Sequence, residues 1–284
     1  MFQDKKIAFI GPGVMAGAMI AGLIREKVAP VESILIAGPN VRRNEQLQQK
    51  YGVQPFTDNA QAASQADVVV LSIKPQTLDR VLDDLVGKVK PDALVLSIIA
   101  GAPISKIARG LKHDAIVRSM PNTPARIGRG ITVWTASPAV TEAQQEMARQ
   151  ILSALGDEVF MDDEKYLDMA TALSGTGPAY VFLFMEAMID AGVHLGFPRR
   201  VAEKLVVETL RGSVAYYLNS SESRPLHPAR MRNQVTSPGG TTAAALYFLE
   251  KAGFRTAISR AIWAAYERSR ELGHDPEAHA PETT

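Results

Sequence analysis

Small residues near the N-terminus form the first pattern that could do chemistry. Residues 11–16 read G-P-G-V-M-A, which fits G-x-G-x-x-A, and they lie between an apolar run and a helical pattern. Gly11 permits a sharp turn, Gly13 lets a pyrophosphate approach the backbone, and Ala16 lets the helix pack closely on the strand. The helix start offers free N–H groups to phosphate. A plain strand–helix turn is the alternative to the dinucleotide site that we predict at Gly11, Gly13, Val14, Met15 and Ala16.

The segment after the second apolar run bears on which dinucleotide is bound. Sites for NAD usually place Asp or Glu there to hold the ribose hydroxyls. Residues 37–43 read A-G-P-N-V-R-R and contain no acid, but they contain Asn40, Arg42 and Arg43. A guanidinium pairs with a 2′-phosphate through two parallel hydrogen bonds. We therefore expect NADPH to be preferred over NADH, unless the two arginines are only solvated helix residues.

Two further loops follow predicted strands, and ligands of open α/β sheets bind at the carboxyl ends of strands. One loop contains Ser72, Lys74 and Pro75, and the other, M-P-N-T-P at residues 120–124, contains Asn122. We expect all four residues to lie beside the cofactor, with Lys74 and Pro75 on its ribose and nicotinamide side. An ordinary rigid turn is the alternative for each loop.

A second anion site is predicted at residues 235–242, which read V-T-S-P-G-G-T-T. The Pro-Gly-Gly sequence makes a tight turn, and Thr241 can cap a helix that begins at Thr242. Backbone N–H groups and the hydroxyls of Ser237, Thr241 and Thr242 would then meet at a helix N-terminus, which favours a carboxylate. A well-capped helix start without a ligand is the alternative.

A third glycine segment, S-G-T-G-P at residues 174–178, is predicted to interrupt two helical patterns. Its glycines allow close approach of a cofactor, a substrate or another helix, and the spacing does not discriminate among them. Pro178 suits the first position of the helix that follows.

Composition excludes several classes of chemistry. The chain has no cysteine, which excludes disulfides, thiolate nucleophiles and Cys-based zinc sites. Its five histidines show no metal-ligand spacing, so we expect no metal. The net charge is +1 with acids and bases intermixed, which predicts no nucleic-acid partner. We recognise neither a signal peptide nor a membrane span and expect a cytoplasmic protein.

These loops need a scaffold of alternating strands and helices. The predicted strands are short apolar runs, at residues 7–10, 34–37, 67–74, 93–100, 115–120 and 131–135. The helices between them have apolar residues at helical spacing, at residues 15–27, 42–51, 76–86 and 141–155. Uniformly apolar strands are buried on both faces, and their alternation with helices implies a parallel sheet. We predict a doubly wound α/β domain over residues 1–162.

The rest of the chain, residues 163–284, is predicted to be an all-α domain. Its helices are expected at residues 164–173, 178–195, 199–218, 242–252 and 254–272. The helix over residues 179–193 is apolar on almost every side, broken only by Glu186 and Asp190. Such a helix is buried all round, and a domain of about 120 residues has little material to surround it. We expect a subunit interface, with a central core helix as the alternative.

Five motifs together resemble those of the pyrroline-5-carboxylate reductase family. The motifs I-G-P-G-V-M-A, I-K-P-Q, M-P-N-T-P, S-G-T-G-P-A-Y and V-T-S-P-G-G-T-T occur in this order, and the resemblance spans about residues 5–272. The last motif resembles the family's signature. The resemblance implies a Rossmann-like cofactor domain, a helical dimerisation domain with interlocked subunits, and larger assemblies of dimers up to a decamer.

The resemblance also implies a reaction: NADPH-dependent reduction of the C=N bond of 1-pyrroline-5-carboxylate to L-proline. It implies a substrate held between one subunit's cofactor domain and helical segments shared at the dimer interface. Carried over, Ser237 and the backbone of Gly240, Thr241 and Thr242 hold the substrate carboxylate. The Thr242 hydroxyl lies near the ring nitrogen and is the candidate catalytic group. One departure is Val14, where the family often has Asn, which removes a polar contact near the cofactor.

The residues themselves favour an imine over an alcohol as the reacting group. An imine is activated by protonation, so positioning, a carboxylate anchor and a weak donor suffice. A hydroxy-acid dehydrogenase needs a stronger base, usually Lys or His. His194, His227, Lys165 and Lys204 all lie outside the glycine motifs. The alternatives are a related imine or β-hydroxyacid-type reductase and a non-catalytic NADPH-binding sensor, although a sensor has no need of a carboxylate cradle.

Overall fold

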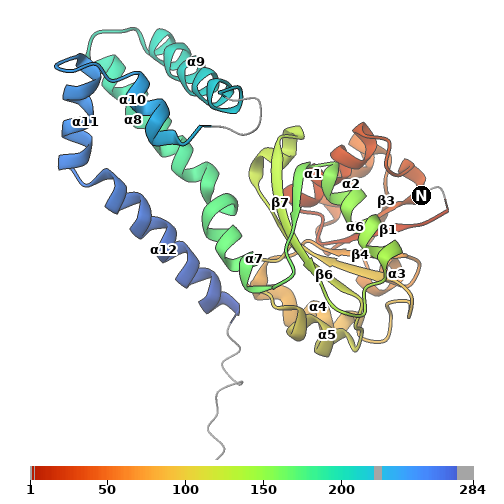
Figure 1. Cartoon of the computed structure of the whole chain (residues 1–284). Helices are drawn as coiled ribbons and strands as arrows, with labels where there is room; N and C mark the ends of the chain where they lie inside the picture. Colours follow the sequence, from red (N-terminus) through yellow and green to blue (C-terminus); the bar gives the residue numbers. More distant parts are fainter. Residues whose placement is uncertain (1, 3, 221–225, 274–284) are drawn as a thin grey trace, which may run out of the picture. The chain divides into compact units, whose positions relative to one another are not determined.

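The computed structural model describes residues 2, 4–220 and 226–273. The end of the predicted second domain, residues 274–284, lies outside them. The chain forms two compact units (Figure 1). The sheet unit comprises Met1–Pro178 together with Trp263–Thr284, and the helical unit comprises Ala179–Ile262.

The sheet unit is built on one sheet of eight strands in the order β3-β2-β1-β4-β5-β6-β7-β8. The strand bounds are β1 Ile7–Ile10, β2 Ile34–Ala37, β3 Gln54–Phe56, β4 Val68–Leu71, β5 Leu94–Ser97, β6 Ile116–Pro121, β7 Gly130–Ala136 and β8 Gly156–Phe160. The strand order reverses at β1, which pairs in parallel with β2 on one side and β4 on the other. Such a switch point is where doubly wound sheets bind their ligands.

The prediction of a parallel sheet is confirmed for β1 to β6 and is wrong at β7. β7 pairs antiparallel with β6, and β8 then pairs in parallel with β7. The connection from β6 to β7 is only the short 3-10 segment η3, Thr123–Ile127. A parallel neighbour requires a crossover of a dozen or more residues, so this short connection reverses the chain instead.

Helices cover both faces of the sheet. Their bounds are α1 Val14–Arg25, α2 Val41–Tyr51, α3 Asn59–Ala63, α4 Leu78–Leu85, α5 Ile104–Leu111 and α6 Glu142–Ser153. Residues of α1, α2 and α6 share a core with Ile7 and Phe9 of β1, and residues of α3, α4 and α5 share a second core with Ala8 and Ile10. Alternate residues of one strand therefore face opposite layers, which explains why the strands are apolar throughout.

Sequence patterns missed five short elements: β3, α3, α5, β8 and α10, Pro228–Gln234. β3 contains Pro55 and lies at the edge of the sheet, where a strand can tolerate proline. α5 has apolar residues at helical spacing, at Ile104, Ile107, Ala108 and Leu111, but it is only eight residues long.

The helical segments after β8 are α7 Lys165–Ala170, α8 Gly177–His194, α9 Arg199–Leu218, α10, α11 Thr241–Lys251 and α12 Phe254–Gly273. The predicted interruption between two helices at residues 174–178 takes the form of a π-helical turn, Thr171–Gly175, and a bend at Thr176, after which α8 begins at Gly177. The hydroxyls of Thr171, Ser174 and Thr176 donate to the carbonyls of Leu167, Ala170 and Thr171, at 2.7, 3.0 and 2.8 Å. These bonds satisfy carbonyls around the wide turn.

In its described residues, 179–220 and 226–262, the helical unit has almost no core of its own. α8, α10 and α11 have no buried residue, and α9 buries only Ala202 and Val206. The exposed apolar side chains of this unit include Val181, Phe182, Leu183, Leu205, Tyr247 and Phe248. The alternative of a central core helix is therefore contradicted, and the subunit-interface interpretation fits. By length and composition, the helix Lys165–His194 would also be long enough to cross a membrane.

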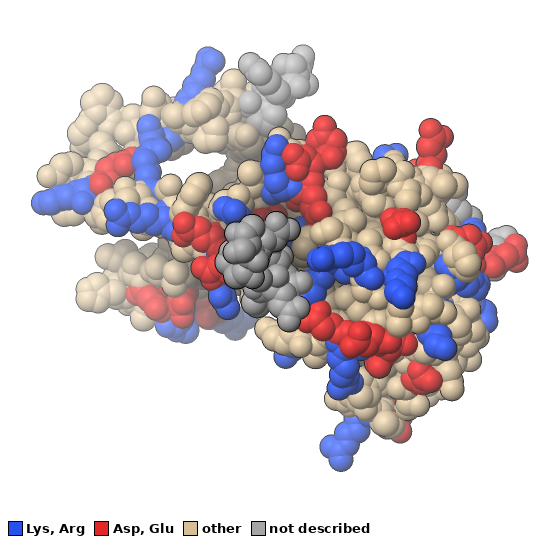
Figure 2. All heavy atoms as spheres, turned by 90° about the horizontal axis from the view of Figure 1, so that it is seen from below, with Lys and Arg blue, Asp and Glu red and all other residues tan. Residues whose placement is uncertain are grey.

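Surface charges of both signs are interspersed. Figure 2 shows acidic and basic side chains intermixed on the face that it draws, in keeping with 31 basic and 30 acidic residues in the chain. That face shows no large patch of a single sign, whereas a nucleic-acid interface would present a large basic patch.

One carboxylate ties together the amino ends of β1 and β4. Asp67 accepts hydrogen bonds from the Lys6 N–H at 2.8 Å and from the Lys90 ammonium at 3.0 Å. Burial raises the pKa of Asp67, but the bonds from Lys6 and Lys90 together outweigh it, so the net pKa lies below the ordinary value. A carboxyl whose pKa is lower in the folded state stabilises the fold above its unfolded pKa, and this contribution is lost as the pH falls through the folded pKa.

We expect Asp67→Asn to lower the free energy of unfolding at pH 7 by about 1–2 kcal/mol, since the charge-assisted bonds are weakened. The difference from the unchanged protein should shrink as the pH falls from the ordinary pKa of Asp, about 3.9, toward the lower pKa of folded Asp67. Urea denaturation at pH 7 and in this acidic range measures this, with the exposed Asp83→Asn as the control. A loss of stability that is equal at pH 7 and in the acidic range would contradict the assigned role of the charge.

Candidate active site

The glycine loop is fixed by backbone contacts among three strand ends. Gly11 has φ +86°, and a Cβ there would lie 2.4 Å from the Cγ2 of Ile73. Its N–H donates to the Ala37 carbonyl at 2.8 Å, which ties the end of β1 to the end of β2. The Ser72 hydroxyl, at the end of β4, donates to the carbonyls of Ile10 and Gly11, both at 3.0 Å. Ser72 thus positions the loop through these carbonyls, and the Ile73 side chain occupies the space beside Gly11.

Gly13 differs from Gly11 because no residue that the structure describes requires it to lack a side chain. Its φ is −78°, and a Cβ there would meet only the Gly11 carbonyl oxygen, at 3.9 Å. Gly13 is the N-cap of α1, no side chain caps the helix, and the first turn contains no acid. Open space before a row of free N–H groups fits a pyrophosphate. Ala16 lies fully buried behind this cradle, and Val14 is 65% exposed in front of α1.

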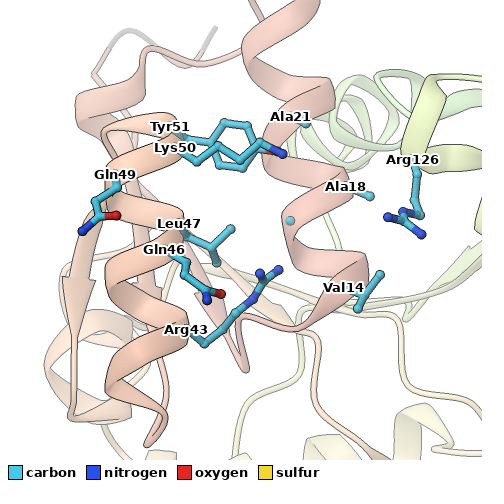
Figure 3. A pocket seen from close by; sticks show the side chains of 11 residues that line it. Val14, Ala18, Ala21, Arg43, Gln46, Leu47, Gln49, Lys50, Tyr51 and Arg126 are labelled. Atoms are coloured by element: carbon cyan, nitrogen blue, oxygen red, sulfur yellow. The ribbon is translucent and has the colours of Figure 1, made fainter.

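The predicted 2′-phosphate residues lie at the start of α2. The Asn40 side chain accepts a hydrogen bond from the Arg43 N–H at 3.1 Å and caps the helix. The Arg43 guanidinium donates to the carbonyls of Pro12 at 3.0 Å and Gly13 at 3.2 Å. Figure 3 shows Arg43 reaching from α2 toward α1 across a hollow that also includes Lys50 and Arg126 and no acid. Arg43 therefore braces the glycine loop, and its charge has no carboxylate partner in the lining of this hollow.

The remaining predicted cofactor residues lie at the carboxyl ends of β4 and β6, on the same edge of the sheet as the glycine loop. Lys74 is exposed, and its carbonyl accepts from the Thr77 hydroxyl at 2.9 Å as the 3-10 turn Pro75–Thr77 begins. Asn122 is only 9% exposed, and its side-chain oxygen accepts from the Ile131 N–H at 3.0 Å. Asn122 thus lies at the carboxyl-end edge of the sheet, as predicted, and it also links the end of β6 to β7.

The loop before α11 is a tight turn. The Gly240 N–H donates to the Ser237 carbonyl at 3.1 Å, with Pro238 second in the turn and Gly239 third at φ +69°. Proline followed by a glycine with positive φ is typical of a type II turn. A Cβ on Gly240 would lie 2.4 Å from the Ser237 Oγ, so the serine hydroxyl is folded directly against the helix start.

The prediction that Thr241 caps this helix is wrong. α11 begins at Thr241 itself, Gly240 is the extended N-cap with φ −79° and ψ 172°, and no side chain caps the helix. The turn brings the chain into helical geometry one residue earlier than the sequence suggested. The first-turn N–H groups are consequently left for another acceptor, and no acid lies in that turn. Free N–H groups beside the Ser237 and Thr242 hydroxyls suit a carboxylate.

The predicted site residues thus form two groups, one in each unit. The sheet unit brings together the glycine loop, the start of α2 and the ends of β4 and β6. The helical unit brings together Ser237, Gly240, Thr241 and Thr242. Sequence reasoning gave no role to Ile73 and Gly38, although both lie within the quoted motifs; a Cβ on Gly38 would lie 2.7 Å from the Pro12 Cδ.

Comparisons with known proteins agree with this division. Residues 164–272 match the family model described as pyrroline-5-carboxylate reductase dimerisation, and residues 6–101 match one described as NADP oxidoreductase, coenzyme F420-dependent. A pyrroline-5-carboxylate reductase from a Synechocystis species is 44% identical over 268 residues, covering 94% of this chain and 98% of the relative.

Two solved structures are similar over nearly the whole chain. The pyrroline carboxylate reductase of Plasmodium falciparum with NADP bound has a TM-score of 0.87 and 30% identity, covering 96% of this chain and 100% of that one. The pyrroline-5-carboxylate reductase of Coxiella burnetii has a TM-score of 0.85 and 34% identity, covering 95% and 99%.

The two loop glycines give a matched pair of substitutions. Gly13→Ala should leave the melting temperature nearly unchanged, because the chain has room for the Cβ, and should weaken NADPH binding by roughly tenfold or more, about 1.4 kcal/mol. Gly11→Ala should instead destabilise the fold by roughly 1–2 kcal/mol through its positive φ. Thermal unfolding and a fluorescence titration with NADPH measure both. Unweakened binding by a folded Gly13→Ala protein would contradict the pyrophosphate cradle.

Proposed function

The chain belongs to the pyrroline-5-carboxylate reductase family, and we propose that it reduces the C=N bond of 1-pyrroline-5-carboxylate by holding two anions on helix N-termini. It is an NADPH-dependent oxidoreductase of proline synthesis. The observation that carries the proposed site is the start of α11, where a Ser-Pro-Gly-Gly turn leaves the first-turn N–H groups without a side-chain cap.

The cofactor half lies in the sheet unit. We propose that Gly11, Gly13, Val14, Met15 and Ala16 form the pyrophosphate cradle at the start of α1, where the free N–H groups and the space before Gly13 support this role. Arg42 is exposed and Arg43 is held at the loop, so both can face a 2′-phosphate, with Asn40 fixing the start of α2. Ser72, Lys74, Pro75 and Asn122 lie toward the ribose and nicotinamide. When bound, NADPH supplies the hydride from its nicotinamide C4.

The substrate half lies in the helical unit. We propose that the Ser237 hydroxyl and the N–H groups of Thr241 and Thr242 hold the substrate carboxylate against the backbone of Gly240, whose own N–H closes the turn on Ser237. The dipole of α11 strengthens this attraction because its N-terminus carries partial positive charge. A carboxylate held at a fixed point orients the ring and thus the C=N bond.

Beyond binding the cofactor and the substrate, the protein has only to assist one proton transfer. The C=N carbon gains a hydride and the nitrogen gains one proton, which gives the secondary amine of proline. We propose that the Thr242 hydroxyl hydrogen-bonds to the ring nitrogen, donating to the neutral imine and accepting from the protonated one, and that the proton which the nitrogen gains comes from this hydroxyl or from water. A hydroxyl suffices because a protonated imine is already a strong electrophile.

The protein self-associates through its dimerisation domain, and the uncovered apolar side chains of α8 supply the surface. We propose that dimers build a higher assembly, with a decamer as one such form, and that the enzyme is cytoplasmic. We also propose that the functional domains divide at residues 1–162 and 163–284. The dimerisation match begins at residue 164, which supports this division, while the compact sheet unit continues to Pro178.

The role of Arg42 is tested by cofactor preference. Arg42→Ala should lower kcat/KM for NADPH by roughly ten- to a hundredfold, since a charged hydrogen-bond pair contributes about 1.5–3 kcal/mol. The value for NADH, which has no 2′-phosphate, should change little. Steady-state assays with both cofactors measure this, and the exposed Arg80→Ala on α4 is the control. An equal fall with both cofactors would show that Arg42 does not read the 2′-phosphate.

The role of Thr242, and the function with it, is tested by NADPH oxidation with three substrates. We expect turnover of 1-pyrroline-5-carboxylate, and little with a six-membered imine acid or a 2-keto acid. Thr242→Ala should lower kcat/KM for the five-membered imine by roughly tenfold or more, since proton transfer aided by a positioned group is worth at least that much. NADPH binding should be retained, and Thr242→Ser should keep most activity. Reduction of only the keto acid would refute the proposed function.

A further inference from the structure

A buried cation in β6 has no role in the site described so far. The side chain of Arg118 is 5% exposed. A buried guanidinium is costly unless its N–H groups and its charge are matched. Two carboxylates match it here: Glu164 just before α7, at 2.8 Å, and Asp168 within α7, at 3.0 Å.

The spacing of the two acids suits one planar guanidinium. Glu164 and Asp168 are four residues apart, so they lie on one face of the helical segment. One terminal nitrogen of Arg118 donates to Glu164 and the other to Asp168. The Ile104 N–H, at the start of α5, also donates to Glu164 at 2.8 Å. The network therefore joins β6, α5 and α7.

The last partner comes from the far end of the chain. The Ser269 hydroxyl, on α12, donates to Asp168 at 2.8 Å. Ser269 is the only residue of α12 that is buried in the part of the chain that the structure describes, and it is 2% exposed. Four residues later the backbones of α12 and the loop after β5 touch: a Cβ on Gly101 would lie 3.0 Å from the Gly273 N. The end of α12 is thus docked beside α7 (Figure 1).

Charged groups fix a position more narrowly than apolar contacts do. An apolar helix face can slide by fractions of a turn at little cost, whereas a guanidinium that bonds two carboxylates has one good geometry. Buried ion pairs add little to stability compared with well-packed apolar residues, and register is the best-attested reason to keep them. The network is therefore suited to fixing the positions of α7 and the end of α12 along β6.

The network lies at both connections between the units. The chain leaves the sheet unit at Pro178, after α7, and returns to it at Trp263, within α12. Asp168, which bonds Arg118, anchors the first connection, and Ser269, which bonds Asp168, anchors the second. The π-helical turn after α7 also packs on the end of β6, because a Cβ on Gly175 would lie 2.8 Å from the Met120 Cε. The segment between the two connections carries Ser237 and Thr242.

We propose that Arg118 is a positioning residue for the reduction. Through Glu164, Asp168 and Ser269, it holds α7 and the end of α12 in one position against β6. β6 is the strand that leads into Met120 and Asn122. The two ends of the segment that carries the carboxylate loop are thereby both bonded, directly or through Asp168, to Arg118. This inference rests on the proposed function, since it concerns the alignment of the imine with the nicotinamide.

The test uses the mildest change in the network, so that folding is preserved. Ser269→Ala removes one hydroxyl, and Ser269→Thr retains it. Ser33→Ala is the matched control, because Ser33 is also buried and donates to a backbone carbonyl, Pro30, at 2.7 Å. Arg118→Lys keeps the charge but cannot bond both carboxylates as a fork. The measurements are kcat/KM for the imine, the isotope effect with NADPH deuterated at C4, the NADPH dissociation constant and the melting temperature.

We expect Ser269→Ala to lower kcat/KM by roughly tenfold and Arg118→Lys by about a hundredfold, as a displacement of about 1 Å can do. The isotope effect should rise because hydride transfer becomes slower, while the NADPH dissociation constant should stay within about twofold. Ser269→Thr and Ser33→Ala should behave like the unchanged protein.

Two results would overturn the proposal. One is Ser269→Ala kinetics that match those of Ser33→Ala. The other is a loss of activity that follows the melting temperature, with an unchanged isotope effect, because that would indicate a structural role alone. An unchanged protein that binds NADPH but does not reduce the imine would overturn the proposed function and this inference with it. The first two results leave the function standing.

Discussion

An α-helix begins with N–H groups that have no partner within the helix, and the candidate site depends on that constraint. α1 and α11 both begin after a glycine, in extended geometry at their N-caps, and neither has a side-chain cap. Each start is stiffened from outside: Ser72 and Arg43 bond the carbonyls around the first, and the Ser237 turn fixes the second. Two rigid sets of donors are thus ready for two anions, with little to rearrange on binding.

The reaction explains why so few ionisable side chains are needed at these loops. The reactants carry their own charges, as phosphates and a carboxylate, and backbone N–H groups can hold both. The imine needs one proton, for which a threonine hydroxyl or a bound water is adequate. Alignment of the two helix starts, rather than a strong acid or base, is the demanding part of this mechanism.

The sequence predicts features that have a local cause, and it misses those caused by contacts far along the chain. The glycine loop and the buried strands follow from residue types alone, because Gly11 needs positive φ and β1, β2 and β4 are apolar on both faces. The reversal at β7 depends on which neighbour a short connection can reach. The start of α11 lies one residue earlier than predicted because the local turn from Ser237 to Gly240 makes Gly240 the extended N-cap. The Arg118 network joins residues 46, 50 and up to 151 positions away, so no pattern of spacing reveals it.

The most direct test of this account compares two imines that differ only in the anion. The value of kcat/KM for 1-pyrroline-5-carboxylate is measured against that for 1-pyrroline, which has the same ring and C=N bond without the carboxylate. If helix-start N–H groups anchor the substrate, the carboxylated imine should be favoured by at least about a hundredfold, since two charged hydrogen bonds are lost. Similar values for the two imines would contradict the account, because the α11 cradle would then contribute nothing to catalysis.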